Sequence, residues 1–294
     1  MTPSLNRCSI CGSTHFVDVC WWKGARIVRC SSCGVVFSSL RPDESELLRL
    51  YNDGTLPQGS NEDQVAAEIT FPRWKLREHS HVLQMLASLG VTGGELLDIG
   101  CLWGSFLDSA RRSGFQVTGI EPNAPAATYG RKILKMNIFQ GSLNDLSLPP
   151  CSFDAVTMLD VIEQLRDPVS ALQIVRRLLK PEGVLVVVTP NVEGLPVRVI
   201  GLKRRIFCQP WCPIDDPPWH LWGFSRRTAS RALVRAGYCV EAVEGLSPSI
   251  FTTNAGADIK PWKRLGLTGL SGVGLLIGRS DRIAVYGRAA SHAG

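Results

Sequence analysis

The sequence contains no uninterrupted apolar run that approaches the roughly 20 residues of a membrane-spanning helix. Its first residues, 1–7, also lack a basic segment leading into an apolar one, so they do not resemble a secretory signal. We therefore expect a cytoplasmic protein. The composition is otherwise that of a folded chain, because 45% of its 294 residues are hydrophobic. A chain of this length can bury one large core with an appendage, or two ordinary cores.

Two familiar phosphate-binding motifs are also missing. The chain has no Gly-Lys-Ser/Thr phosphate loop, and a dinucleotide fingerprint would require glycine where Leu102 and Ser105 follow Gly100. A side chain at position 102 would block the close approach of a pyrophosphate. These absences argue against nicotinamide, flavin and nucleoside triphosphate ligands.

The charge of the chain is moderately positive, with a formal net value of +6. Its basic residues stand in scattered pairs and in one triplet at 203–205. Dispersed pairs are more typical of solvated helix faces than of a nucleic-acid track, so nucleic acid is not an expected partner. The charge permits an anionic substrate without requiring one.

Ten cysteines without a secretion signal point to metal ligation or to reduced thiols. Four of them form two C-x2-C pairs with 18 residues between, which is the spacing of a closed four-thiolate zinc site: Cys8, Cys11, Cys30 and Cys33. Four thiolates leave no open position, so the predicted zinc is structural. Cys20, Cys208 and Cys212 are interpreted as ordinary thiols.

A short ribbon over residues 1–40 is predicted around this zinc site. Gly12 and Gly34 follow the second cysteine of each pair and supply the backbone freedom of the turn. Between the pairs, a hairpin with Lys23 and Gly24 near its tip is expected. Metal ligation would supply much of the folding free energy of so small a unit.

The rest of the chain predicts a doubly wound α/β fold. After a helical connector at 41–70 and a helix at 71–90, strands and helices alternate. Strands are expected at 95–100, 115–122, 137–141, 153–160 and 184–191, and helices at 103–114, 124–135 and 167–183. In such folds, ligands bind beyond the carboxyl ends of the strands.

The C-terminal third is less regular. Residues 191–222 are rich in proline, tryptophan and basic residues, and are predicted to form a lid or substrate loop. A helix at 225–237 and strands at 238–245 and 281–288 follow. The glycine-rich stretch at 265–278 is predicted to be a helix under the sheet edge; a lipid-contacting patch is the less favoured alternative, because the stretch lacks a strongly basic face.

A glycine turn and a later acidic residue suggest a nucleoside site without phosphates. Gly100 and Gly104 let a ligand approach the backbone, and Glu121 ends the next expected strand. A carboxylate there could accept hydrogen bonds from both hydroxyls of a ribose. Taken alone, this pattern also arises by chance between strands and helices.

The order and spacing of four motifs make the resemblance specific. LLDIGCLWGSF, GIEPN, QGSLNDLSLPPCSFDAVTMLDVIEQLRDP and LLKPEGVLVVVTPN resemble the class I S-adenosylmethionine-dependent methyltransferases over about residues 70–290. HLWGFSRRTASRALVRAGY is similar to the small-molecule branch that includes ubiquinone-type O-methyltransferases, and the cysteine ribbon is similar to that of sugar and natural-product methyltransferases. The resemblance implies a Rossmann-like seven-stranded sheet with an antiparallel last strand, formed by residues 71–294.

The resemblance also implies a cofactor, an acceptor class and residue roles. S-adenosylmethionine would bind with a small-molecule acceptor, such as a sugar, a polysaccharide precursor or a secondary metabolite, for O- or C-methylation. The implied roles place Asp98, Gly100, Gly104 and Asp160 near the methionine portion, Glu121 at the ribose, and Ser142 and Leu143 at the adenine. Leu102 replaces the middle glycine of the family loop, and Gln164 replaces the histidine of its Glu-His-Leu segment.

If the acceptor is a hydroxyl, a general base would assist, and His220 is the first candidate and Glu163 the second. A structural role for His220, pinning the lid, is the alternative. Two other functions remain open: a zinc-ribbon RNA methyltransferase, favoured by the ribbon and the positive charge, and a non-catalytic methyltransferase-like binding protein, favoured by Leu102 and Gln164.

Overall fold

A computed structural model describes most of the chain. The described residues are 6–40, 42, 43, 45, 46, 49, 73–145, 148–214, 220–246 and 261–289. The connector predicted at 41–70 falls almost entirely outside them.

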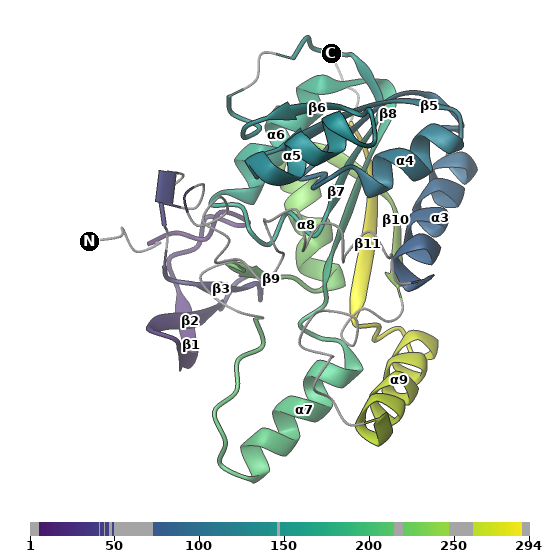
Figure 1. Ribbon diagram of the computed structural model, residues 1–294. Coiled ribbons are helices and arrows are strands. Elements are labelled where there is room, and N and C mark those ends of the chain that lie inside the picture. The colour runs from purple at the N-terminus through teal and green to yellow at the C-terminus, as the bar shows by residue number, and fades with distance from the viewer. Residues whose placement is uncertain are drawn as a thin grey trace.

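A seven-stranded sheet forms the centre of the molecule, in the order β10-β11-β8-β7-β4-β5-β6 (Figure 1). Strands β4 to β8 are parallel to their neighbours among themselves, whereas β11 is antiparallel to both β8 and β10. This confirms the predicted doubly wound sheet with its antiparallel last strand. The strands span Gly94–Ile99 (β4), Phe115–Glu121 (β5), Asn137–Gln140 (β6), Phe153–Leu159 (β7), Leu179–Pro190 (β8), Tyr238–Leu246 (β10) and Arg282–Ala289 (β11).

Helices cover both faces of this sheet. β8 illustrates the cause, since alternate residues of a strand face opposite sides: Val184 and Val186 join one core cluster, and Leu185 and Val187 join the other. Helices α3, α4 and α5 pack into the first cluster and α6 and α8 into the second. The helices span Arg73–Ser88 (α3), Ser105–Arg112 (α4), Ala124–Lys132 (α5), Pro168–Leu178 (α6) and Arg226–Arg235 (α8).

One boundary differs from the sequence prediction. The helix expected at 167–183 begins as predicted, with the Asp167 carboxylate accepting the backbone N–H groups of residues 169 and 170. It ends at Leu178, however, because Pro181 cannot continue a helix and the residue before a proline favours an extended backbone. β8 therefore starts at Leu179, with an irregular register before Val184.

The N-terminal ribbon forms a second, smaller sheet. β1 (Phe16–Trp22) and β2 (Ala25–Cys30) make the predicted hairpin, and Lys23 and Gly24 both take the left-handed backbone conformation that its two-residue turn requires. β3 (Val36–Ser38) continues the sheet. Its fourth strand, β9 (Trp222–Gly223), comes from the far end of the predicted lid.

The ribbon consequently shares a core with the large sheet instead of standing alone. The ring of Phe37 lies 5.2 Å from that of Trp222, which is 1% exposed. Arg227 of α8 donates a hydrogen bond to the carbonyl of Cys33 at 3.0 Å. Nothing in the local sequence pattern indicated this long-range pairing of residues 36–37 with 222–223.

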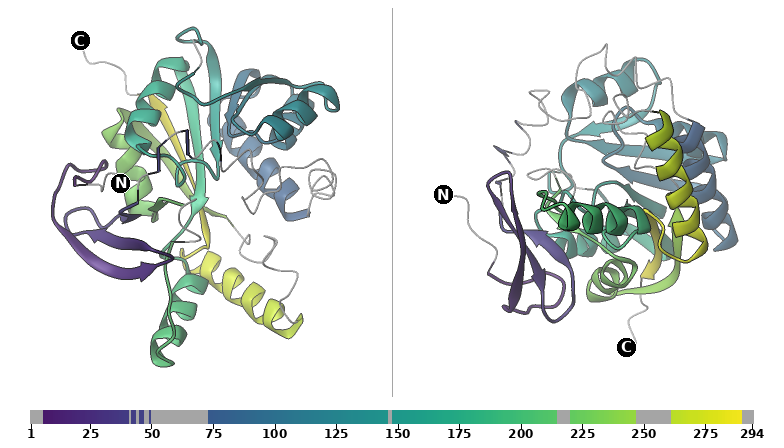
Figure 2. Two further views of the ribbon diagram at one scale, coloured as in Figure 1. Left: turned by 60° about the vertical axis from the view of Figure 1, so that its left-hand side comes forward. Right: turned by 90° about the horizontal axis from the view of Figure 1, so that it is seen from below.

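The predicted lid is more regular than expected. Residues after β8 form helix α7 (Leu195–Ile206), which packs against α9 (Pro261–Leu276). The glycine-rich stretch is thus helical as predicted, and the helix packs against α7; both helices project beyond the end of the sheet (Figures 1 and 2). Among the described residues, no helix has the length and apolar character needed to cross a membrane.

Candidate functional site

The carboxyl ends of β4, β5, β6 and β7 bring most of the sequence-predicted site residues to one edge of the sheet. The loop after β4 begins at Gly100, whose N–H donates to the carbonyl of Ile120 at 2.8 Å. Gly100 has φ +70°, and a Cβ there would lie 2.5 Å from Cγ2 of Val161. Only glycine fits this position, because both the backbone conformation and the packing exclude a side chain.

Leu102 occupies the middle of this loop with φ +49°, a conformation that glycine adopts more readily than leucine. Its backbone N–H donates to Oε2 of Glu121 at 2.8 Å. Gly104 closes the loop at φ +92° and precedes the first residue of α4. Leu102 therefore holds a backbone conformation of the kind that favours glycine.

Glu121 accepts hydrogen bonds from two loop residues at the carboxyl edge of the sheet. Its second oxygen, Oε1, accepts the N–H of Asn123 at 2.7 Å, and the residue is 2% exposed. Burial raises the pKa of Glu121 to about 7, although the two backbone N–H donors oppose that rise. Each carboxylate oxygen keeps a lone pair beyond these two bonds.

Asp98 lies one residue before the end of β4 and is also buried. The hydroxyl of Thr157 on β7 donates to its Oδ1 at 2.6 Å. Burial raises the pKa of Asp98 to about 7, the Thr157 hydrogen bond lowers it, and the nearby Glu121 raises it further. Asp98 therefore ties β4 to β7 beneath the loop.

The loop after β6 lies next to Glu121, because the N–H of Gly141 donates to the Glu121 carbonyl at 3.0 Å. Ser142 follows, and its N–H donates to Oδ2 of Asp145 at 2.7 Å. The hydroxyl of Ser142 is buried and, after the backbone N–H, also interacts with the Asp145 carboxylate, so that both groups lower the pKa of Asp145. Leu143 packs at the margin of the larger core cluster.

Asp160 follows β7 with φ +62° and lies in an ion-pair network that the sequence did not reveal. Arg282, at the start of β11, contacts Oδ1 of Asp160 at 2.6 Å and Oε2 of Glu78 at 2.9 Å. Lys75 of α3 contacts Oδ2 of Asp160 at 3.2 Å. Burial opposes ionisation of Asp160, but Arg282 and Lys75 outweigh it and lower the pKa of that carboxyl.

A signal for Arg282 was available in the sequence. It is a charged residue at the first position of β11 and is followed by five uncharged residues, and an antiparallel strand starts at the edge where its parallel neighbours end. A charge at that point is therefore near the carboxyl-edge site. Lys75 and Glu78 gave no comparable signal, because charged residues are ordinary on an amphipathic helix.

Glu163 is bonded through its backbone to the segment that follows His220. The carbonyl of Glu163 accepts the N–H groups of Leu221 and Trp222, at 2.8 and 3.0 Å, so the residues next to His220 rest on the loop after β7. The carboxyl of Glu163 is 1% exposed and accepts from the Thr189 hydroxyl at 2.9 Å. Burial, and then the charge of Asp160, raises the pKa of Glu163 to about 8.

Gln164 has a structural contact that its sequence position did not indicate. Its side-chain amide donates to the carbonyl of Asp160 at 2.7 Å. This bond closes the turn in which Asp160 holds a left-handed conformation. The residue that departs from the family pattern thus stabilises the loop between Asp160 and Glu163.

Comparison with known proteins identifies the family of this fold. A family described as a methyltransferase domain matches residues 71–243, which is more than half of the chain. The chain belongs to this methyltransferase family. The match includes every loop of the carboxyl edge described above, from the loop after β4 to the one after β7.

Curated relatives of the methyltransferase match it over a shorter stretch. It is 32% identical over 124 residues to the ubiquinone biosynthesis O-methyltransferase of Paracidovorax citrulli, covering 38% of this chain and 50% of that protein. The corresponding enzyme of Alkalilimnicola ehrlichii is 34% identical over 110 residues, covering 35% of this chain and 44% of that protein. The chain thus spans about half the length of the curated relatives it matches.

Solved structures agree with the methyltransferase fold. A geranyl diphosphate methyltransferase in complex with S-adenosylmethionine superposes with a TM-score of 0.53 at 18% identity, covering 78% of this chain and 90% of that one. The geranyl diphosphate C-methyltransferase of Streptomyces coelicolor gives a TM-score of 0.51 at 17% identity, covering 78% and 84%. At these identities the similarity concerns the fold.

The ribbon of the methyltransferase brings its four predicted metal-ligating cysteines together. All four Sγ atoms lie within 4.8 Å of one another, with Cys8 and Cys33 at 3.7 Å and Cys11 and Cys30 at 3.5 Å. The two turns are equivalent, since the N–H of Gly12 donates to the Cys8 carbonyl and that of Gly34 to the Cys30 carbonyl. Tetrahedral zinc with Zn–S bonds of 2.3 Å would separate its sulfurs by about 3.8 Å, so the cluster fits such an ion.

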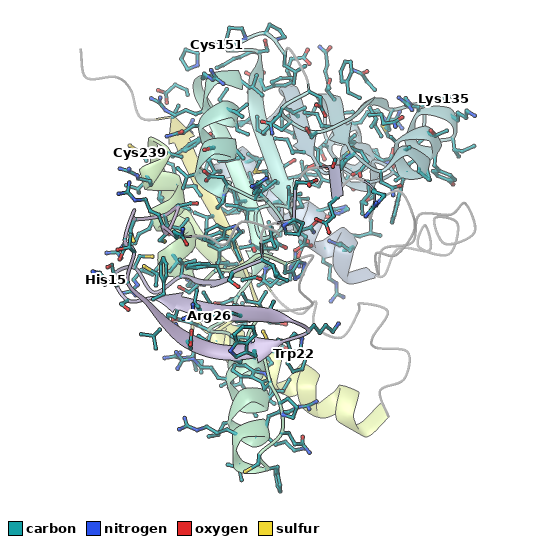
Figure 3. All side chains as sticks on the ribbon, turned by 90° about the vertical axis from the view of Figure 1, so that its left-hand side faces the viewer. His15, Trp22, Arg26, Lys135, Cys151 and Cys239 are labelled. Atoms are coloured by element: carbon teal, nitrogen blue, oxygen red, sulfur yellow. The ribbon has the colours of Figure 1, made fainter. Side chains whose placement is uncertain are left out.

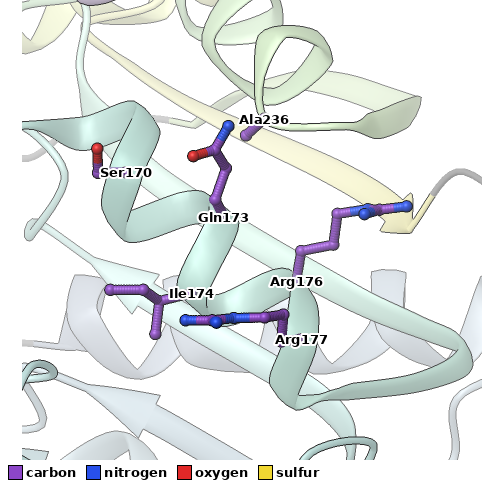
Figure 4. A pocket seen from close by; sticks show the side chains of 6 residues that line it. All are labelled: Ser170, Gln173, Ile174, Arg176, Arg177 and Ala236. Carbon is purple, nitrogen blue, oxygen red and sulfur yellow. The ribbon is translucent and has the colours of Figure 1, made fainter.

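A surface hollow elsewhere on the methyltransferase does not belong to this site. It lies on the α6 and α8 side and is lined by Ser170, Gln173, Ile174, Arg176, Arg177 and Ala236 (Figure 4). None of these residues comes from a loop at the carboxyl edge.

The raised pKa of Glu163 predicts a pH-dependent stability difference. Native Glu163 keeps its proton up to about pH 8, whereas the unfolded chain releases it near 4.5, so wild-type stability decreases as pH rises between these values. Glu163→Gln removes this loss. In urea unfolding curves, the free energy of unfolding of the variant should increase relative to that of wild type from pH 5 to 8, by up to about 1.4 kcal/mol per pH unit.

Glu182→Gln provides the control, since this side chain is 88% exposed. A stability difference between Glu163→Gln and wild type that stays constant from pH 5 to 8 would show that Glu163 is ionised in the folded protein.

Proposed function

We propose that the chain is an S-adenosylmethionine-dependent methyltransferase that acts on a small molecule by O- or C-methylation. The observation that carries this proposal is the buried carboxylate of Glu121, hydrogen-bonded to the left-handed loop from Gly100 to Gly104, in a chain of the methyltransferase family. This arrangement presents an acceptor for ribose hydroxyls beside a backbone that a ligand can approach closely.

The residues at the edge fit the proposed cofactor. The buried Ser142 hydroxyl lies in the loop after β6, whose Gly141 N–H is bonded to the Glu121 carbonyl. In this proposal Glu121 holds the ribose, Ser142 and Leu143 contact the adenine, and Gly100 and Gly104 line the methionine portion. Leu102 lies in the same loop. Its side chain would obstruct a pyrophosphate, and the proposed cofactor contains none.

Asp98 and Asp160 would act at the methionine end. Asp98 is buried beneath the glycine loop and bonded to Thr157, so it serves to fix the loop. Asp160 is held ionised by Arg282 and Lys75, so it can orient an ammonium group. When bound, S-adenosylmethionine supplies an electrophilic methyl carbon on a sulfonium with a good leaving group. The protein then needs mainly to position the acceptor and exclude water.

His220 is the proposed general base for a hydroxyl acceptor. Glu163, with its pKa raised to about 8 and its carboxyl bonded to Thr189, is mostly protonated at neutral pH and poorly suited to accept a proton. Its backbone carbonyl instead holds the segment that follows His220. Glu163 is therefore proposed as a positioning residue.

The names of the relatives are consistent with a small acceptor. The curated relatives are ubiquinone biosynthesis O-methyltransferases, and solved structures with this fold include a geranyl diphosphate C-methyltransferase. We propose an acceptor of comparable size for this chain.

We also propose that the four-cysteine cluster binds one structural zinc ion. Cys8, Cys30 and Cys33 are buried, and the four thiols surround a single tetrahedral position. A closed shell of four thiolates leaves no position for an acceptor, so this ion would stabilise the ribbon and take no part in methyl transfer.

Cofactor binding tests the proposed function directly. Calorimetry should detect binding of S-adenosylmethionine to the wild-type chain, and Glu121→Gln should weaken it at least about tenfold, because one charge-assisted hydrogen bond contributes about 1.5–3 kcal/mol. Glu95→Gln, at the opposite end of β4, should leave the dissociation constant unchanged. No binding at millimolar cofactor would favour a non-catalytic binding protein instead.

The His220→Gln variant tests the proposed base. With an acceptor found by release of S-adenosylhomocysteine from a panel of hydroxylated small molecules, the variant should lower kcat about 100-fold or more. The decrease in wild-type kcat at acidic pH should disappear with it, because a protonated imidazole cannot accept a proton. Unchanged kcat and an unchanged pH profile would contradict the assignment and leave His220 a structural residue of the lid.

Elemental analysis tests the zinc proposal. The purified chain should carry about one equivalent of zinc, and Cys8→Ser or removal of the metal with a chelator should lower the thermal unfolding midpoint, because ligation contributes on the order of 10 kcal/mol to such ribbons. Cys239→Ser changes an exposed thiol away from the cluster and serves as the control (Figure 3). Less than about half an equivalent of zinc would count against the site.

A further inference from the structure

Helices α7 and α9 form a two-helix unit, here called the helical pair, that projects beyond the carboxyl edge of the sheet (Figures 1 and 2). Backbone hydrogen bonds and a close helix contact join its base. The N–H of Leu195 donates to the carbonyl of Arg279 at 2.8 Å, and a Cβ at Gly274 would lie 3.1 Å from Cβ of Leu195. The N–H of Asn191, at the end of β8, also donates to the carbonyl of Asp281 at 2.7 Å. Backbone hydrogen bonds therefore connect the pair to the end of β8 and to the start of β11.

The helical pair carries an unusual concentration of exposed apolar side chains. Eight of the fourteen exposed large hydrophobic residues identified in the described parts of the chain lie on it: Val199, Leu202, Ile206, Phe207, Val273, Leu275, Leu276 and Ile277. On α7, positions 199, 202 and 206 follow helical spacing and share one face. Leu202, Ile206 and Phe207 are 62–65% exposed and Leu276 is 86% exposed. Exposed apolar side chains gathered in this way are typical of an interaction surface and not of a helix face that only contacts water.

The same unit is positively charged. Within residues 195–214 and 269–280 the described side chains include five basic residues and no acidic one: Arg198, Lys203, Arg204, Arg205 and Arg279. The triplet at 203–205 lies between Leu202 and Ile206 on the last turn of α7. The described side chains of α9, at residues 269–276, carry no charge; α7 supplies the basic residues of the pair, because the fold places the two helices together.

We propose that the helical pair is a docking surface for an anionic lipid bilayer. Exposed apolar side chains enter the boundary between headgroups and acyl chains, while interleaved Lys and Arg contact anionic headgroups. The charge selects this occupant, since an excess of one sign disfavours contact with a second copy of the same surface. No described helix spans a membrane, so the proposed attachment is peripheral.

Docking of this kind would also orient the molecule. The pair continues from the carboxyl end of β8 and leads back to the start of β11, where Arg282 lies. The edge of the sheet that carries Glu121 and Asp160 would then face the bilayer. The lipid contact itself does not depend on methyl transfer, so the two proposals can fail separately.

Vesicle co-sedimentation of the full chain tests the proposal. In about 0.1 M salt the chain should sediment with vesicles containing phosphatidylglycerol and much less with pure phosphatidylcholine, and higher salt should release it. Lys203→Gln combined with Arg204→Gln and Arg205→Gln should lower the partition coefficient at least about tenfold. Leu202→Ser combined with Ile206→Ser and Phe207→Ser should do the same.

Matched controls come from α5 and the residues after it. Ile133→Ser changes a side chain that is 59% exposed, and Lys132→Gln with Lys135→Gln removes two exposed charges at the other end of the molecule from α7 (Figure 3). These variants should sediment like wild type. All variants should retain wild-type binding of S-adenosylmethionine, which separates loss of docking from loss of the fold.

Three results would overturn the proposal. Wild type could fail to sediment with either kind of vesicle, or the two α7 variants could sediment as well as wild type. Light scattering could instead show a dimer that dissociates in the Leu202→Ser, Ile206→Ser, Phe207→Ser variant, without vesicle binding by wild type. That last outcome would assign the surface to a second copy of the chain.

Discussion

The buried guanidinium of Arg282 holds three separate parts of the chain at the carboxyl edge of the sheet. It joins β11, to which it belongs, with Asp160 after β7 and Glu78 of α3. Without it, the buried Glu78 and the part-exposed Asp160 would keep only Lys75 as a counter-ion, and removing one partner of a buried ion pair typically costs about 3–5 kcal/mol. The loop that continues to Glu163 starts at Asp160, so its position also depends on this ion pair.

Local patterns predicted most of the fold. The apolar run of β8, the Asp167 N-cap and the glycine turn after β4 each act over a few residues, so their consequences can be read in the sequence. Contacts between distant segments could not be predicted in this way. Neither the pairing of β3 with β9 nor the packing of α9 on α7 has a local signal, because each depends on how the complete sheet arranges the segments that leave it.

In the candidate site too, local motifs were predicted from the sequence and contacts between distant segments were not. Motif spacing brought Asp98, Glu121 and Asp160 to one edge, since the carboxyl ends of parallel strands meet there. The partners of these residues were missed because backbone groups carry no sequence signal: the N–H of Leu102 bonds Glu121, and Gln164 bonds the carbonyl of Asp160. The Leu102 bond uses a backbone N–H that a glycine would also supply, and the Gln164 bond supports the turn at Asp160, so both residues contribute a contact within the site.

The ribbon and the candidate site are physically connected through the segment after His220. On one side, Trp222 and Gly223 pair with β3 of the ribbon, and Trp222 packs against Phe37. On the other side, the N–H groups of Leu221 and Trp222 bond the carbonyl of Glu163. The segment is therefore held between the ribbon and the loop after β7. Because the ribbon is too small to fold on its own core, its thiol cluster also contributes to fixing the chain around His220, about 190 residues further along the sequence.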